Sequence, residues 1–170
     1  MDIYLVRHAE AVEQVEGGGD DGVRWLTKKG RKGMQKAAAR LHKKRVRPDL
    51  IVSSPLTRAV QTAELLMADL GAHAELIADS RLAPEGTPDQ VAELLQNHPK
   101  CDSIMLVGHE PLLSQTATLL LGRERVARLA KGSCLCLEIR QKPGKPARFV
   151  WYAAAGNLVR SAKKALVPAD

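Results

Sequence analysis

The sequence predicts an α/β fold, a three-layer sandwich with a mostly parallel central sheet flanked by helices. Short apolar runs typical of buried strands alternate with longer segments of helical periodicity. Residues that start and stop helices, such as Thr27 and Gly122, stand between these segments. The 170 residues can bury one sizeable core, and no linker, repeat or low-complexity stretch divides them. We therefore expect a single domain over residues 1–170.

The first half of the chain is expected to contain three strands and two helices. In order, they are a strand at 3–6, a helix from 28 to about 44, a strand at 49–54, a helix from 55 to 70 and a strand at 74–79. Thr27 is a typical cap for the first helix, whose apolar stripe is Met34, Ala37, Ala38 and Leu41. The second helix opens at Pro55, has Val60, Ala63, Met67 and Leu70 on one face, and stops at Gly71.

The second half adds two helices, three strands and a short final helix. In order, they are a helix from Thr87-Pro88 to about 97, a strand at 103–109, a helix at 112–121, strands at 134–139 and 148–153, and a helix within 157–166. The sequence "KPGKP" between the last two strands indicates a hairpin turn.

The composition is that of a globular chain from a reducing compartment. The three cysteines cannot close a disulfide framework, and none lies in a C-x-x-C pair. The first residues, "MDIYLV", lack the basic region of a signal peptide, and no apolar run has the length of a membrane span. We expect a cytoplasmic protein with no membrane partner.

Charge is distributed unevenly within a net charge of +7. Residues 2–21 contain six acids and one base, whereas residues 24–47 contain eleven Lys or Arg and no acid. A solvated helix face would explain this run, and so would a docking surface for an acidic partner or for nucleic acid. Trp25 is the only aromatic residue in the run, which offers little stacking surface for single strands, so nucleic acid is not the expected partner.

Four cationic or titratable side chains stand at the ends of three expected strands. Arg7 and His8 follow the first strand, Arg58 lies in the helical turn after the second, and His109 follows the fourth. Because the carboxyl ends of parallel strands gather functional sites, these residues are candidates for one site. Two guanidiniums and two imidazoles suit a dianionic phosphoryl group. No ligand cluster for a metal and no nucleotide-binding loop is present, so neither a metal nor a cofactor is expected.

Three segments carry a resemblance to a known family. "LVRHAEA", "SSPLTRAVQTAELL" and "IMLVGHEPLL" resemble the motifs of the histidine phosphatase superfamily, whose fold is called phosphoglycerate mutase-like. The resemblance covers roughly residues 2–120. The short chain is similar to the small SixA-type branch, the protein phosphohistidine phosphatases. Only 50 residues separate Arg58 from His109, which leaves no space for the insertion that caps the site in sugar-phosphate relatives.

The resemblance implies a role for each matched residue. His8 would be the nucleophile that forms a phosphohistidine intermediate, with one ring nitrogen free and the other donating to a backbone carbonyl. Arg7, Arg58 and His109 would bind the phosphoryl oxygens. A proton donor is needed for ester substrates, and Glu85 is the candidate by position, although an exposed loop glutamate is an equal interpretation.

The expected function is a metal-independent phosphatase that acts on phosphohistidine in a protein, such as a histidine-phosphorylated signalling domain. Two alternatives remain open. One is a phosphatase of a small phosphoester such as a nucleotide or sugar phosphate, and the other is a non-catalytic binder of phosphorylated or polyanionic partners.

Overall fold

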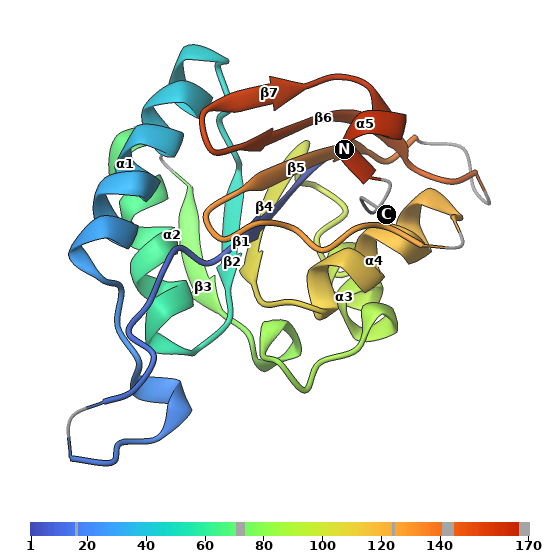
Figure 1. Ribbon diagram of the computed structural model, residues 1–170. Helices are drawn as coiled ribbons and strands as arrows, with labels where there is room; N and C mark the ends of the chain where they lie inside the picture. The colour runs from blue at the N-terminus through green and yellow to red at the C-terminus, as the bar shows by residue number, and fades with distance from the viewer. Residues whose placement is uncertain (16, 71–73, 124, 141–144, 167–170) are drawn as a thin grey trace.

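A seven-stranded sheet with helices on both faces forms the centre of the computed structural model, which describes residues 1–15, 17–70, 74–123, 125–140 and 145–166 (Figure 1). The strands are β1 (Asp2–Arg7), β2 (Leu50–Ser53), β3 (Glu75–Ala78), β4 (Ser103–Gly108), β5 (Cys134–Glu138), β6 (Arg148–Ala154) and β7 (Asn157–Val159). The helices are α1 (Lys28–Lys43), α2 (Thr57–Leu70), α3 (Pro88–Gln96), α4 (Leu112–Leu121) and α5 (Ala162–Leu166), with short 3₁₀ turns η1 (Asp21–Val23) and η2 (Ser80–Leu82).

The sheet is mixed, with strand order β3-β2-β4-β1-β5-β6-β7. The strands β3, β2, β4 and β1 pair in parallel, and the remaining pairings are antiparallel. Parallel pairing accounts for the expected strand–helix alternation, since each parallel connection needs a crossover. The predicted three-layer α/β sandwich is confirmed.

Alternation along β1 explains the three layers. Ile3 and Leu5 join the core that α3, α4 and α5 cover, whereas Tyr4 and Val6 join the core under α1 and α2. Successive side chains of a strand point to opposite faces, so a strand covered on both sides is apolar throughout. The position of β1 between β4 and β5 therefore explains its continuous apolar run.

The amino-terminal end of α1 lies very close to the residues that follow β1. Thr27 caps the helix by accepting from the Gly30 amide at 2.9 Å. A Cβ on Gly30 would lie 2.0 Å from the Glu10 carbonyl oxygen, so only glycine permits this approach. Sequence and structure agree on the inner stripe of α1, although Ala37 is only partly buried.

Two details differ from the sequence prediction. The buried face of α2 contains Ala59, Ala63, Leu66 and Leu70, whereas Val60 and Met67 are only partly buried, because the helix also turns Arg58 and Thr62 inward. Residues 157–159 form strand β7 rather than helix, and only Ala162–Leu166 are helical. The expected stop at Gly71 and residues 142–144 of the hairpin turn lie outside the described residues. Within the described ranges, no helix has the length and apolarity needed to cross a membrane.

Candidate active site

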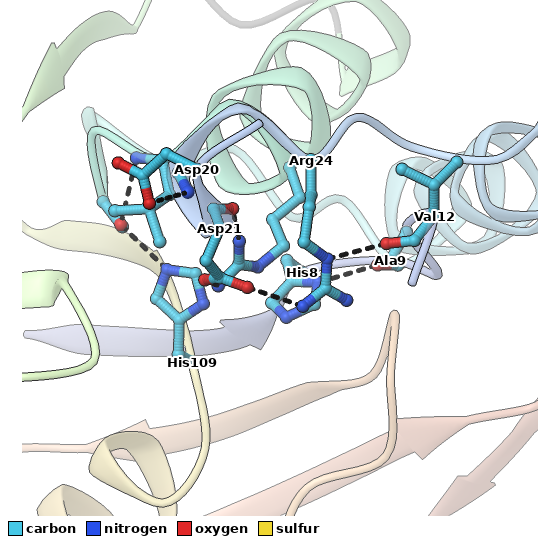
Figure 2. A network of polar contacts seen from close by, with 11 residues as sticks. His8, Ala9, Val12, Asp20, Asp21, Arg24 and His109 are labelled. Atoms are coloured by element: carbon cyan, nitrogen blue, oxygen red, sulfur yellow. Dashed lines mark hydrogen bonds and ion pairs between the residues drawn. The ribbon is translucent and has the colours of Figure 1, made fainter. Parts of the chain in front are cut away.

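Strand register brings the sequence-predicted residues together. Arg7 is paired with Gly108 and Ser53 with Val107, so β1, β2 and β4 end at nearly the same level. The His8 amide continues the pairing by donating to the Gly108 carbonyl at 3.1 Å. The imidazoles of His8 and His109 consequently lie side by side, with ring centroids 5.0 Å apart (Figure 2).

The His8 ring is held in one tautomer. Its Nδ1 lies 2.7 Å from the Ala9 carbonyl oxygen, which can only accept, so Nδ1 carries the proton. The expected bond to a backbone carbonyl is therefore present, and Nε2 retains its lone pair. Burial chiefly, together with the charges of Arg58, Arg7 and Lys131, lowers the pKa of His8 to about 4 in spite of the bond to Ala9. The ring is neutral at pH 7, as a nitrogen nucleophile must be.

His109 is buried and bonds on one side only. Its Nε2 lies 2.8 Å from the Ser54 hydroxyl, whereas its Nδ1 is buried without a partner. Burial chiefly, and then the proximity of His8 and Arg58, lowers the pKa of His109 to about 3. If the Ser54 hydroxyl donates to Nε2, the neutral ring presents an N–H at Nδ1 that a ligand oxygen can accept.

Arg58 is buried in the first turn of α2 and binds the loop that contains η1. Its Nη1 donates to the Asp21 carbonyl oxygen at 2.7 Å, and its Nη2 lies 2.8 Å from Asp21 Oδ2. Arg24 donates to the other Asp21 oxygen at 2.6 Å and, through Nε, to the Val12 carbonyl at 2.7 Å (Figure 2). The bond from Arg24, followed by that from Arg58, lowers the pKa of Asp21, so this carboxylate is ionised at neutral pH.

Arg7 is partly buried and only partly bonded. Its Nη1 donates to the Leu129 carbonyl oxygen at 2.7 Å, while its Nε is buried without a partner. Within the described residues, the buried side-chain polar atoms that lack partners are Arg7 Nε, His109 Nδ1 and Ser133 Oγ. An unpaired buried donor costs roughly 1–3 kcal/mol. With the proton of His109 on Nδ1, both nitrogens are donors, and a ligand rich in acceptor oxygens could satisfy them.

Two further residues of α2, Gln61 and Thr62, form hydrogen bonds with the segments that surround the site. Thr62 accepts from the Ala9 amide at 3.1 Å and donates to the Arg58 carbonyl at 2.6 Å. Gln61 accepts from the Leu26 amide at 2.9 Å and so fixes the end of the loop that carries Asp21. The helix α2 therefore positions Arg58 itself, Ala9 and the end of the loop that carries Asp21.

The glutamates near the motifs lie in three different settings. Glu85 is exposed in the turn after η2, and among the described residues it has no hydrogen bond or ion pair to the other candidate site residues. Glu110 accepts from the Leu129 amide and the Ser114 hydroxyl, which steadies the segment that binds Arg7. Glu10 pairs with Lys29 at 2.9 Å and with the Thr27 hydroxyl. The structure thus brings His8, Arg58 and His109 together with Arg7 beside them, and leaves Glu85 on the surface.

Sequence reasoning missed Asp21, Arg24 and Thr62. Both Asp21 and Arg24 lie in a loop without periodicity. Asp21 bonds to Arg58, which lies 37 residues along the chain, and Arg24 bonds to Val12 and to Asp21 itself. Their signal was the loop's paired acids followed by an arginine, "DDGVR". Thr62 lies within the segment "SSPLTRAVQTAELL", but the sequence did not indicate a role for it. In the part of the chain that the structure describes, no group of three or more His, Cys, Asp or Glu could hold a metal ion.

Comparisons with known proteins agree with this geometry. A family model described as the histidine phosphatase superfamily, branch 1, matches residues 3–83. An uncharacterized protein of Picosynechococcus sp. is 35% identical over 120 residues, which cover 69% of this chain and 71% of that protein. The residues that the family model matches include Arg7, His8 and Arg58.

Solved structures share the fold at low sequence identity. The protein histidine phosphatase SixA complexed with tungstate superposes with a TM-score of 0.81 and 23% identity, covering 89% of this chain and 96% of that one. The alpha-ribazole phosphatase from Shigella flexneri superposes with a TM-score of 0.68 and 18% identity, covering 100% of both chains. These two neighbours act on a phosphorylated protein and on a small molecule, as their names say, and at such identities they establish the fold alone.

Proposed function

Because this chain belongs to the histidine phosphatase superfamily and is a phosphatase, we propose that His8 is its nucleophile and that its substrate is phosphohistidine on a protein. The observation that supports the nucleophile best is the bond from His8 Nδ1 to the Ala9 carbonyl, which leaves Nε2 free on a neutral ring. A neutral, oriented imidazole can attack phosphorus without first losing a proton.

The proposed reaction has two steps. In the first, the substrate's imidazole has taken a proton from solvent on its other ring nitrogen, Nε2 of His8 attacks phosphorus in line, and the bond from phosphorus to the leaving nitrogen breaks, so that the substrate's imidazole leaves as a neutral ring. In the second, water attacks the phosphohistidine of His8, releases inorganic phosphate and restores the neutral ring. Arg7, Arg58 and His109 hold the phosphoryl oxygens through both steps, so side chains supply the positive charge that the transition state needs.

The requirement for an acid distinguishes the substrate classes. An alkoxide leaving group needs a proton donor, whereas an imidazole is a better leaving group and can also be protonated before it leaves. The ionised Asp21 accepts hydrogen bonds in the site and is not poised to donate a proton. Glu85, exposed in the turn after η2, remains the proposed donor for ester substrates. A site without a recessed acid is better matched to phosphohistidine.

The short segment between Arg58 and His109 supports a protein substrate. The described residues between Arg58 and His109 belong to α2, β3, η2, α3, β4 and their short connections, and none forms an additional layer over the site. An additional layer there would hinder the approach of a phosphorylated side chain on a folded partner. The second candidate, a small phosphoester, is supported by the shared fold with the alpha-ribazole phosphatase. The third, a binder without activity, is disfavoured because all four matched residues are present.

Two measurements test the proposal. The first compares hydrolysis of a phosphohistidine protein with hydrolysis of a chromogenic aryl phosphate, both in excess chelator. We expect turnover of both with higher kcat/KM for the protein, and loss of activity that a divalent ion restores would contradict the proposal. In the second, the enzyme is quenched during turnover of ³²P-labelled substrate and its peptides are mapped. Label should lie on His8, should vanish in His8→Ala and should persist in the surface control His42→Ala.

A further inference from the structure

A long groove runs along α1 and faces the turn between β6 and β7. One part is a cavity of about 230 Å³, and an adjoining part measures about 400 Å³. Both parts are lined by Ala37, Arg40, Gly132, Ala155 and Gly156, so they are two halves of one depression. Figure 1 shows the β6–β7 turn approaching α1. A Cβ on Gly156 would lie 2.9 Å from Arg40 Nη2, so the guanidinium lies against this turn.

One end of the groove lies beside the candidate active site. Its larger half is lined by Ala9 and Gly132. The Gly132 amide lies 3.1 Å from the carbonyl oxygens of both Arg7 and His8, and the Ala9 carbonyl accepts from the His8 ring. A chain whose phosphorylated side chain is bound at His8 can therefore continue directly into the groove.

The rim of the groove is strongly cationic. Its lining contains Lys29, Lys36, Arg40, Lys43, Lys44 and Lys131, against one carboxylate, that of Glu10. All six cationic residues are exposed. The Glu10 carboxylate pairs with Lys29 at 2.9 Å, and in the described parts of the chain none of the other five is in an ion pair. The residues on α1 recur at helical spacing and form one stripe.

The floor of the groove is apolar and lacks aromatic rings. Ala37, Leu41, Cys134 and Ala154 line its smaller half. A base-stacking platform needs aromatic side chains, and none lines either half. The stripe from residue 29 to residue 44 spans about 22 Å at 1.5 Å per helical residue, which corresponds to about seven residues of extended chain.

We propose that this groove binds an acidic, extended segment of the phosphorylated protein substrate, next to the phosphorylated residue. The inference rests on the proposed function for its partner, and it concerns binding rather than chemistry. Asp and Glu of the segment pair with the exposed cations of the rim, while small apolar side chains lie on the floor. Complementary charge favours encounter with such a segment and rejects basic partners.

The test compares two triple variants that remove the same charge from the same helix. The groove variant is Lys36→Gln/Arg40→Gln/Lys43→Gln. The control is Lys28→Gln/Arg31→Gln/Lys32→Gln, which changes exposed residues that line neither half of the groove. The probes are two fluorescent unphosphorylated heptapeptides, one with alternating Glu and Ala and one with Gln in place of Glu, measured by anisotropy at low and high salt.

We expect the acidic peptide to bind the wild-type protein at least about tenfold more tightly than the neutral one at low salt. The groove variant should lose this preference, the control should keep it, and both should keep the melting temperature and kcat on aryl phosphate. Equal weakening by both triples would overturn the proposal, since the helix would then act only through its overall charge. Equal binding of the two peptides by wild type would also overturn it, as would tighter, groove-dependent binding of a dT10 oligonucleotide.

The result does not depend on turnover. Failure to hydrolyse phosphohistidine would refute the proposed substrate while peptide binding still decided the groove. Arg40→Lys, which keeps the charge beside Gly156, should bind the acidic peptide as wild type does. Loss of binding in that variant would overturn the charge pairing that the proposal requires.

Discussion

Burial determines the charge of individual side chains in the site. His8 and His109 have pKa values lowered to about 4 and 3 chiefly because the protein removes them from water. The charges of Arg58, which is buried, and of Arg7, which is partly buried, add repulsion to any further positive charge. The positive charge of the site is therefore carried by its guanidiniums, while its imidazoles stay neutral at pH 7.

Arg58 should be far more sensitive to shape than to charge. Arg58→Lys keeps a cation but loses the fork of donors that binds Asp21 and, in the proposed mechanism, a phosphoryl oxygen. We expect Arg58→Ala to lower kcat/KM by about 10²–10⁴, because charge-assisted hydrogen bonds contribute roughly 1.5–3 kcal/mol each, and Arg58→Lys to recover only part of the loss. Steady-state kinetics on aryl phosphate provides the measurement, and an effect below fivefold for Arg58→Ala would place this residue outside the chemistry.

Asp21 should oppose the binding of phosphate. Its carboxylate pairs with Arg58, so a phosphoryl group that binds Arg58 as proposed would meet a negative charge beside that arginine. We expect Asp21→Asn to lower the inhibition constant of inorganic phosphate by about three- to tenfold, a modest effect because Asp21 is half exposed.

Asp20→Asn is the matched control, because Asp20 is the neighbouring acid and accepts from Gly22 rather than from Arg58. Its inhibition constant should stay at the wild-type value. Weaker phosphate inhibition in Asp21→Asn would show instead that Asp21 is needed to hold Arg58 in place.

At the scale of secondary structure, α2 couples the end of β1 to Arg58, the proposed phosphate ligand. The Thr62 hydroxyl joins the Ala9 amide to the Arg58 carbonyl. Thr62→Val keeps the shape of the side chain but leaves the buried Ala9 amide without an acceptor, which costs roughly 1–3 kcal/mol. We expect lower stability in urea and a kcat reduced by about tenfold. Thr62→Ser retains the hydroxyl and should behave much like wild type in both assays.

The sequence predicts those elements and site residues that neighbouring residues determine, and it does not predict those that depend on contacts with distant parts of the chain. Strands such as 3–6 and the helix after Thr27 follow from periodicity and capping, and Arg7, His8, Arg58 and His109 follow from strand ends and motif. Asp21 could not be found this way, because its partner Arg58 lies 37 residues along the chain. The strand at 157–159 was mistaken for helix because its pairing with β6 depends on a turn at Ala155-Gly156, both with positive φ, that no propensity reveals.

At the scale of the whole molecule, the two histidines should make folding sensitive to mild acid. Their pKa values are about 4 and 3 in the folded protein, against 6.5 as the ordinary value. Between pH 6.5 and about 4 the unfolded chain binds more protons than the folded one, so the free energy of unfolding falls as the pH falls. At pH 5 the loss is at most about 2 kcal/mol for each histidine.

Urea unfolding at pH 7 and pH 5 measures this loss. The double variant His8→Gln/His109→Gln, whose side chains do not titrate, should lose less stability than wild type over the same interval. Identical losses would mean that the two imidazoles take up protons in the folded state at ordinary pH, which would also argue against a neutral nucleophile.

The three attachments made by α2 also limit how the chain length can vary. From the single helix α2, Arg58 binds the η1 loop, Gln61 binds Leu26 and Thr62 binds Ala9. Each residue of an α-helix is rotated by about 100° from the one before it. One inserted residue between Arg58 and Thr62 would swing the arginine by that angle away from the site while the helix itself stayed intact. Insertions and deletions should therefore be tolerated in connections such as 97–102, between α3 and β4. They should be excluded between residues 54 and 62, because the helical repeat there sets the positions of the site residues relative to one another.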